Sequence, residues 1–264
     1  MLEPEQKNFL QKKLNPLLDY RRTNHLKLED CFSESCVYGD ESSDRLYKIA
    51  LAFIEKKIQE HDEYIKMLES WINIPPRFRD KNFENFIEHC SEAAENKQYV
   101  IEYADNFKEV LETGKNLILL GNVGTGKTHL IYSLSRFIVK KYGLHVKYSY
   151  MIYILDAIKE AYGKKKKDRY DYSTVTVDDI VNSLIDAPLL VIDEVGVQYG
   201  TDHEQNVIYQ IIDKRYLAQK PTVVISNCNV AELTTVIGER SISRLNENAE
   251  MLLFRFADQR GRFK

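Results

Sequence analysis

Apolar residues between Asp44 and Ile74 recur at steps of three and four, with Lys and Glu between them. This spacing predicts an amphipathic helix of about eight turns, because residues three and four apart share one helical face. A shorter helix with an apolar face is predicted within residues 1–30, around Pro16. The long helix either packs on this first helix or meets a partner, and the pattern is compatible with both. Its apolar positions are Leu46, Ile49, Phe53, Ile54, Ile58, Ile65, Leu68 and Ile72.

The segment Ile74-Pro75-Pro76 is the strongest break in this pattern. A proline removes a helical hydrogen bond and disfavours helix in the residue before it, so the long helix must end here. We therefore predict a helical N-terminal region over residues 1–74 and a second domain over residues 75–264. Within the first region, residues 31–43 are rich in Ser, Asp, Glu and Gly and are predicted to be a linker.

Beyond the break, apolar runs of strand length alternate with amphipathic stretches of helical length. A helix over 91–112, closed by Gly114, comes first. The predicted strands are 116–120, 144–150, 188–193, 221–226 and 251–256, and the later helices are 128–142, 152–162, 177–186, 203–219, 230–237 and 240–246. Such alternation implies right-handed βαβ crossovers. We expect an α/β fold with a doubly wound, mainly parallel five-stranded sheet and helices on both faces.

The first strand runs into a glycine-rich stretch, Gly121–Thr128, that opens into a helix. Strand, loop and helix in this order match the phosphate-binding pattern GxxxxGK[ST] in its required context. Backbone N–H groups of such a loop converge on phosphates, Lys127 reaches the β- and γ-phosphates, and Thr128 is placed for Mg²⁺. The sequence therefore predicts binding of a nucleoside triphosphate with Mg²⁺. The candidate nucleotide-binding residues are Gly121, Asn122, Val123, Gly124, Thr125, Gly126, Lys127, Thr128 and His129.

The strand over 188–193 ends in two carboxylates, Asp193 and Glu194. The carboxyl ends of parallel strands share one edge, so these side chains are expected beside the glycine loop. Asp193 would act on the Mg²⁺ shell with Thr128, and Glu194 would polarise the attacking water as general base. Asn227, after the next strand, is placed to orient that water, although it is equally typical of a turn. Two carboxylates in this position favour ATP hydrolysis over binding alone.

Charge and cysteine content change this picture little. The formal net charge is −3, so no global field indicates nucleic-acid binding and any such site must be local. The acidic start argues against a secretory signal, and no apolar run reaches the roughly 20 residues of a membrane helix. Four cysteines suggest free thiols in a reducing, cytoplasmic environment. A zinc site at His25, Cys31 and Cys36 is conceivable, but the spacing matches no established pattern.

The stretches 189–198 and 238–245 resemble those of AAA+ ATPases, in particular the DnaC/DnaI/IstB branch of replicative helicase loaders. The resemblance extends from about Arg77 through the C-terminus and includes 83–86. It implies that Arg240 and Arg244 form an arginine pair and that one of the two is the finger that enters a neighbouring subunit's ATP site. We favour Arg244 for this role. The alternative is a surface pair that makes local ion pairs.

The resemblance also implies a sensor arginine after the last strand. Arg260 and Arg262 occupy this region with a different spacing, and we favour Arg260. The resulting candidate catalytic residues are Lys127, Asp193, Glu194, Asn227, Arg240 and Arg244.

The family carries an inserted element that grips single-stranded DNA, and residues 152–176 fit its position. An aromatic side chain can stack on a base, and lysines can follow phosphates, although a lysine run is more often a solvated loop. The candidate DNA contacts are Tyr162, Lys164, Lys165, Lys166, Lys167, Arg169, Thr201 and His203.

Together these features imply an ATP-dependent loader that places a hexameric, ring-shaped replicative DNA helicase on single-stranded DNA. Residues 1–74 would bind the helicase, and the ATPase domain would self-assemble through shared ATP sites. One alternative is an IstB-like transposition helper that acts with a transposase. Another is a nucleotide-gated binding module without hydrolysis, against which Glu194 argues.

Overall fold

The computed structural model describes residues 56, 59–165, 175–198 and 200–259. Several predicted features lie outside these residues: the first helix, most of the long helix before residue 59, the His25, Cys31 and Cys36 cluster, Lys166, Lys167, Arg169 and Arg260. The described residues divide into two compact units, one with 59–67 and 140–143 and the other with 68–139 and 144–259. The predicted boundary between residues 74 and 75 stays a prediction. None of the described helices combines the length and apolarity needed to cross a membrane.

The sheet has five strands in the order β2-β3-β4-β1-β5, and every pairing is parallel. The prediction of a doubly wound five-stranded sheet is thus confirmed. The strands are β1 (Asn116–Gly121), β2 (Val146–Tyr150), β3 (Leu189–Val195), β4 (Thr222–Ser226) and β5 (Ala249–Phe254). β5 starts and ends two residues before its predicted range of 251–256. Its pairing with β1 begins at Ala249, which lies opposite Asn116.

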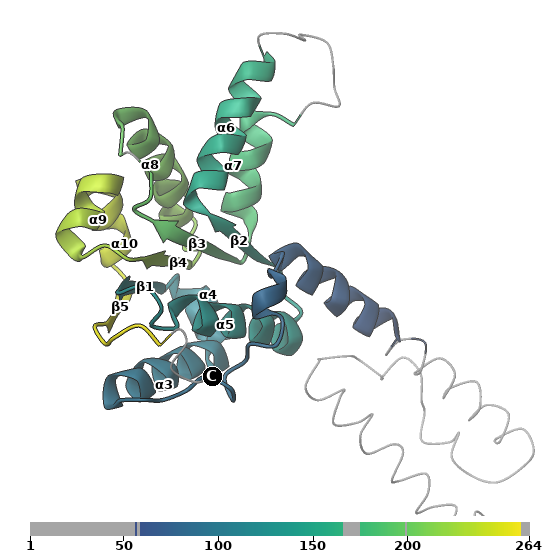
Figure 1. Cartoon of the computed structure of the whole chain (residues 1–264). Helices are drawn as coiled ribbons and strands as arrows, with labels where there is room; N and C mark the ends of the chain where they lie inside the picture. The colour runs from purple at the N-terminus through teal and green to yellow at the C-terminus, as the bar shows by residue number, and fades with distance from the viewer. Residues whose placement is uncertain (1–55, 57–58, 166–174, 199, 260–264) are drawn as a thin grey trace, which may run out of the picture. The chain divides into compact units, whose positions relative to one another are not determined.

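Helices cover both faces of the sheet. Figure 1 shows α6, α7 and α8 on one side and α3, α4 and α5 on the other. The described helical elements are η2 (Pro76–Phe78), α3 (Ser91–Asp105), α4 (Phe107–Thr113), α5 (Lys127–Tyr142), α6 (Met151–Lys165), α7 (Val177–Asp186), α8 (Asp202–Leu217), α9 (Val230–Ile237) and α10 (Glu239–Asn246). Residues 59–72 are also helical and form the C-terminal part of the predicted long helix. That helix ends where predicted, just before Pro75 and Pro76.

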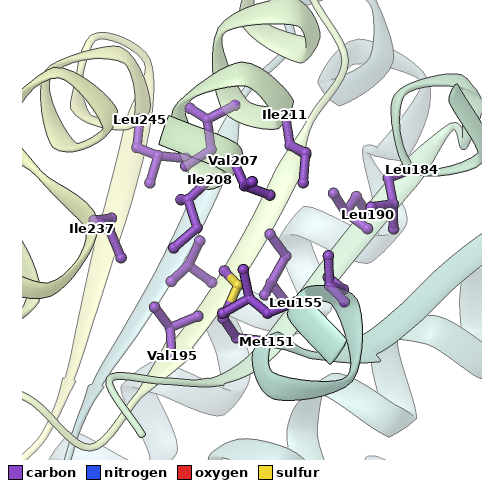
Figure 2. Packing of buried hydrophobic residues seen from close by; sticks show 14 of the residues in the cluster. Met151, Leu155, Leu184, Leu190, Val195, Val207, Ile208, Ile211, Ile237 and Leu245 are labelled. Atoms are coloured by element: carbon purple, nitrogen blue, oxygen red, sulfur yellow. The ribbon is translucent and has the colours of Figure 1, made fainter. Parts of the chain in front are cut away.

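A hydrophobic core lies between the sheet and helices α6 to α10 (Figure 2). Alternate residues of the strands point to opposite faces, so Leu190 and Ile192 of β3 enter this core while Val191 and Asp193 face α5. Helix residues such as Leu155 and Ile208 fill the space above them. Because both faces are covered, β1 and β4 are almost continuously buried, as their apolar sequences predict.

The predicted helix over 91–112 is in fact two helices, α3 and α4, separated at Asn106. The Asn106 side chain donates to the carbonyl oxygen of Glu102 at 3.0 Å. Such side-chain bonds compete with the helical backbone pattern and explain the break. Gly114 closes α4 in the left-handed conformation with φ 66°, as predicted. These two helices bury Ala93, Val100, Tyr103, Ala104, Phe107 and Val110.

Arg215 of α8 is a fully buried cation that ties three segments together. Its guanidinium donates to the carbonyl oxygens at the end of α7, to Pro221 O at 2.6 Å and to the Thr222 hydroxyl at 3.0 Å. Burial lowers the pKa of Arg215. The carbonyl ends of α7 carry the negative end of the helix dipole, which compensates the buried charge. This side chain fixes α7 and β4, and hence the sheet, to α8.

Replacing Arg215 by Met should lower the free energy of unfolding by about 3 kcal/mol or more, because several buried carbonyls lose their donors at once. Urea unfolding followed by circular dichroism measures this loss. Lys214→Met is the matched control: Lys214 is exposed on the same helix, so its loss should stay within about 0.5 kcal/mol. Equal midpoints for the two variants would contradict a structural role for Arg215.

Candidate nucleotide site

The glycine loop connects β1 to α5, the arrangement predicted for a phosphate-binding loop. Lys127 starts α5 and is only 5% exposed. Its Nζ donates to the carbonyl oxygens of Gly121 at 2.6 Å and Asn122 at 2.7 Å. The hydroxyl of Thr125 also donates to Asn122 O, at 2.8 Å. The loop is therefore folded around the lysine amine, which lies within the predicted phosphate cradle.

Residues 82–86 support this loop from the side of α5. A Cβ at Gly126 would lie 2.6 Å from the Phe86 ring, so only glycine allows this close approach. The His129 ring packs edge-on against Phe86, and its Nε2 lies 2.9 Å from Asn82 O. Burial lowers the pKa of His129. His129, predicted to contact nucleotide, is thus engaged with residues 82–86, and its nucleotide role stays a prediction.

Thr128 and Asp193 meet at the carboxyl edge of the sheet, as their spacing predicted. The Thr128 hydroxyl donates to Asp193 Oδ2 at 3.2 Å, and the backbone N–H of Glu194 donates to Asp193 Oδ1 at 2.7 Å. The Asp193 carboxylate is 1% exposed, and burial raises its pKa while these hydrogen bonds oppose the rise. Two hard oxygen groups at this distance fit a site for Mg²⁺, which prefers such ligands.

A third donor to Asp193 comes from Tyr148 of β2, whose hydroxyl hydrogen-bonds to Oδ2. Burial, followed by the neighbouring Asp193 charge, raises the pKa of Tyr148, so its hydroxyl stays protonated. The sequence did not identify Tyr148 as a site residue. The alternating pattern of residues 144–150 predicts a strand, but it does not predict that this strand pairs with β3.

Glu194 differs sharply from its neighbour. Its side chain is exposed, and its backbone takes a left-handed conformation with φ 54°. The pairing of β3 with β4 is irregular between Ile192 and Val195, which turns Glu194 out of the ladder. A non-glycine residue in this conformation costs energy and is characteristic of functional sites. Asp193 therefore faces α5 while Glu194 projects into solvent at the same edge.

Asn227 directly follows β4, which lies between β3 and β1 in the sheet. Ser226, just before it, pairs with Leu120 of β1, so Asn227 lies at the edge that also carries the glycine loop. Its side chain is exposed. This position agrees with the predicted role near the γ-phosphate, which stays a prediction.

The C-terminal segment 254–259 runs along the outer side of the glycine loop. The N–H of Asn122 donates to Phe254 O at 3.0 Å, and the N–H of Gln259 donates to Gly124 O at 3.1 Å. Gly124 has φ 76°, and the carboxylate of Asp258 fills the space where a Cβ would stand. Asp258 was not predicted to belong to the site. Residues far apart in sequence thus form one wall of the loop.

Arg244 lies on α10 and makes a local ion pair. Its Nε donates to Asp213 Oδ1 at 3.0 Å, and its guanidinium lies 4.5 Å from the centre of the Tyr216 ring. A local ion pair is what the alternative to a finger role expects, and the finger role of Arg244 stays a prediction. The exposed Arg240 precedes it by one turn.

Arg244 also lines a cavity of about 380 Å³, together with Asn116 and Thr222, the first residues of β1 and β4. The glycine loop lies at the opposite ends of these strands. Arg244 cannot reach its own chain's loop from there. A catalytic role for it therefore requires a second copy of the chain.

The structure brings two candidate DNA contacts together: the rings of Tyr162 on α6 and His203 on α8 lie 6.1 Å apart. Tyr162 is 48% exposed. Thr201, by contrast, is the N-cap of α8, where its hydroxyl accepts from the N–H of Glu204 at 3.3 Å. Lys164 and Lys165 belong to α6, which extends beyond its predicted end at residue 162. The basic run that starts at Lys164 therefore begins inside a helix.

A wholly parallel sheet of this order, with a glycine loop and a buried carboxylate at one edge, defines a P-loop nucleotide-binding fold of AAA+ type. Residues 74–247 match the family described as IstB-like ATP binding protein. The match covers more than half of the chain, and the chain belongs to this family. The resemblance inferred from the sequence is thereby confirmed.

Two relatives of this chain are named as replicative helicase loaders. The chain is 29% identical over 194 residues to the replicative helicase loader DnaC of Escherichia coli K12, covering 72% of this chain and 73% of that protein. It is 31% identical over 168 residues to the DnaC of a Buchnera aphidicola strain, covering 62% of each.

Solved structures show the same fold. The crystal structure of the DnaC helicase loader has a TM-score of 0.60 at 22% identity, covering 69% of this chain and 100% of that one. The replication initiator DnaA bound to AMPPCP and single-stranded DNA has a TM-score of 0.56 at 22% identity, covering 69% of this chain and 51% of that one.

Replacing Gly124 by Ala should detach the 254–259 segment from the glycine loop, because the added Cβ collides with the Asp258 carboxylate and φ 76° strains an L-residue. Amide hydrogen exchange should report faster exchange at Gln259, whose N–H bonds to Gly124 O.

Gly163→Ala is the matched control, since Gly163 lies within α6 and no atom lies within 4 Å of its added Cβ. That change should leave exchange at Gln259 unaltered and stabilise the helix by up to about 1 kcal/mol. Unchanged exchange in Gly124→Ala would show that the segment does not depend on this contact.

Proposed function

We propose that this chain is an ATP-dependent loader that places a ring-shaped replicative helicase on single-stranded DNA. The observation that carries the proposal is the convergence of Lys127, Thr128 and Asp193 at one sheet edge in a chain related to named helicase loaders. The similarity to the DnaC of Escherichia coli covers 73% of that protein's length, so it extends over most of a loader.

The glycine loop and Lys127 hold the phosphates of ATP. Lys127 exchanges its present carbonyl partners, Gly121 and Asn122, for phosphate oxygens, which are stronger acceptors for an ammonium group. Thr128 and Asp193 would hold Mg²⁺. The bound metal ion would neutralise charge on the β- and γ-phosphates.

Hydrolysis depends on Glu194. Its side chain is exposed at the carboxyl edge of the sheet, next to Asp193, and its carboxylate accepts a proton from the attacking water. Asn227, after the neighbouring strand, orients the same water. The contrast between a buried Asp193 and an exposed Glu194 supports a metal role for the first and a base role for the second.

The ATP site is completed by another copy of the chain. Arg244, with Arg240 beside it, lies at the end of the strands opposite to its own glycine loop, so it acts as a finger for a neighbour. In that arrangement Arg244 leaves Asp213 and Tyr216 for the γ-phosphate of the other copy. ATP binding then orders the interface and hydrolysis releases it. Arg260 is proposed as the sensor arginine on position alone.

Single-stranded DNA is contacted by the surface around Tyr162 and His203. Two aromatic rings 6.1 Å apart offer faces on which bases can stack. Lysines at the end of α6 and beyond follow the phosphates, together with Arg169; these lysines are Lys164, Lys165, Lys166 and Lys167. Thr201 lies two residues before His203. Residues 1–74 are proposed to bind the helicase.

A transposition helper is the second candidate. The matching family is described as IstB-like ATP binding protein, and an IstB-like protein would act with a transposase. The two candidates share the ATPase core and differ in the partner. The named DnaC relatives favour the helicase.

Glu194→Gln should leave ATP affinity within about twofold and lower the turnover of ATP by about 100-fold or more, because only the base is lost. Calorimetry and phosphate release measure the two quantities. Lys127→Ala should instead abolish detectable ATP binding. Turnover by Glu194→Gln equal to that of the unaltered chain would favour the binding module without hydrolysis.

The full-length chain should increase the amount of a hexameric replicative helicase bound to circular single-stranded DNA when ATP is present. Helicase retained on biotinylated circles after a salt wash measures loading. The Lys127→Ala chain is the control and should load none. Loading at the level of this control, combined with ATP-dependent recruitment of a transposase, would favour the transposition helper.

A further inference from the structure

The strongest feature outside the predicted motifs is the buried hydrogen bond from Tyr148 to Asp193. Tyr148 lies on the edge strand β2, opposite Val191 of β3. Val191 and Asp193 are two residues apart and share a face, so the Tyr148 side chain extends along that face to the carboxylate. The Tyr148 side chain is 8% exposed, and the bond is shielded from water.

The ring of Tyr148 is held from the side of α5. It stacks on Tyr132, with ring centres 4.4 Å apart and an angle of 14° between the planes. Tyr132 is itself fully buried and follows Thr128 by four residues, so both lie on one face of α5. The same helical face thus presents a hydroxyl to Asp193 and a ring to Tyr148.

These contacts leave the Asp193 carboxylate little rotational freedom. Oδ2 accepts from Tyr148 and Thr128, and Oδ1 accepts from the N–H of Glu194. When Thr128 turns its hydroxyl oxygen toward a metal ion, the Tyr148 hydroxyl still holds Oδ2. A carboxylate that receives a metal ion in a fixed orientation binds it more tightly, which is why hydrogen-bonded partners of metal-site groups matter.

We infer that Tyr148 is a positioning residue for Mg²⁺, acting through the orientation of the Asp193 carboxylate. The inference rests on the proposed role of Asp193 and Thr128 in holding Mg²⁺. Tyr148 itself touches neither nucleotide nor metal. Its expected effect is on the coupling between Mg²⁺ and ATP rather than on ATP binding alone.

A purely structural role is the alternative, because any buried tyrosine hydroxyl needs a hydrogen-bond partner. The chain offers a matched example in Tyr103 of α3, which is 4% exposed and donates to Lys115 O at 2.7 Å. Replacing either tyrosine by Phe removes one buried hydroxyl and keeps the ring. Only Tyr148→Phe removes a donor from the carboxylate at the nucleotide site.

The experiment uses the full chain with Tyr148→Phe, Tyr103→Phe or Asp193→Asn. Equilibrium affinity for a fluorescent ATP analogue is measured in EDTA and along a Mg²⁺ titration, with thermal melting followed by circular dichroism. In EDTA, Tyr148→Phe should bind the analogue as the unaltered chain does. Its Mg²⁺ concentration for half-maximal tightening should rise about tenfold, the lower end of such partner effects. Tyr103→Phe should show the Mg²⁺ curve of the unaltered chain, whatever its melting temperature.

A Mg²⁺ curve for Tyr148→Phe that matches Tyr103→Phe would overturn the inference and leave Tyr148 a structural residue. Failure of the proposed function gives a different result. If Asp193→Asn also keeps the Mg²⁺ curve of the unaltered chain, Asp193 has no metal role and the inference falls with that role. If the unaltered chain binds no analogue, the nucleotide site itself is wrong.

Discussion

The buried carboxylate of Asp193 is the interaction on which the nucleotide site depends. A charge that is 1% exposed is stable only when donors replace the lost water, and here the donors come from α5, from β2 and from the backbone at the end of β3. Three separate segments therefore supply the hydrogen bonds that stabilise the charged carboxylate in its buried position. The same requirement fixes Thr128 at the start of α5, and with it the position of the glycine loop.

The parallel sheet explains how these segments meet. Because β1 and β3 flank β4, the glycine loop, Asn227 and the pair Asp193 and Glu194 reach one edge. Arg215 holds the opposite side of this arrangement by joining α7, α8 and β4. At the sheet edge with the catalytic candidates, Glu194 is exposed and has a strained backbone, whereas the strands behind it are buried. The buried strands hold the candidate side chains in fixed positions at this edge.

The sequence was sufficient for the five strands, because buried parallel strands are continuous apolar runs, and for the glycine loop and Asp193, because their spacing is tied to the strand ends. The sequence was insufficient for contacts that depend on which strands or helices become neighbours in the fold. Tyr148 reaches Asp193 only because β2 lies beside β3, and Asp258 reaches Gly124 only because β5 pairs with β1. Arg215 has the pattern of an ordinary basic residue near a helix end, and the surrounding carbonyls that bury it come from other segments.

The contact between segment 254–259 and the glycine loop has a consequence for how the protein is made. A ribosome releases the chain from its N-terminus at about 5–20 residues per second, so the loop emerges on the order of ten seconds before its outer wall does. During that interval Asn122 and Gly124 lack their backbone partners, Phe254 and Gln259. A nascent chain therefore carries an unfinished loop until residues 254–259 have emerged.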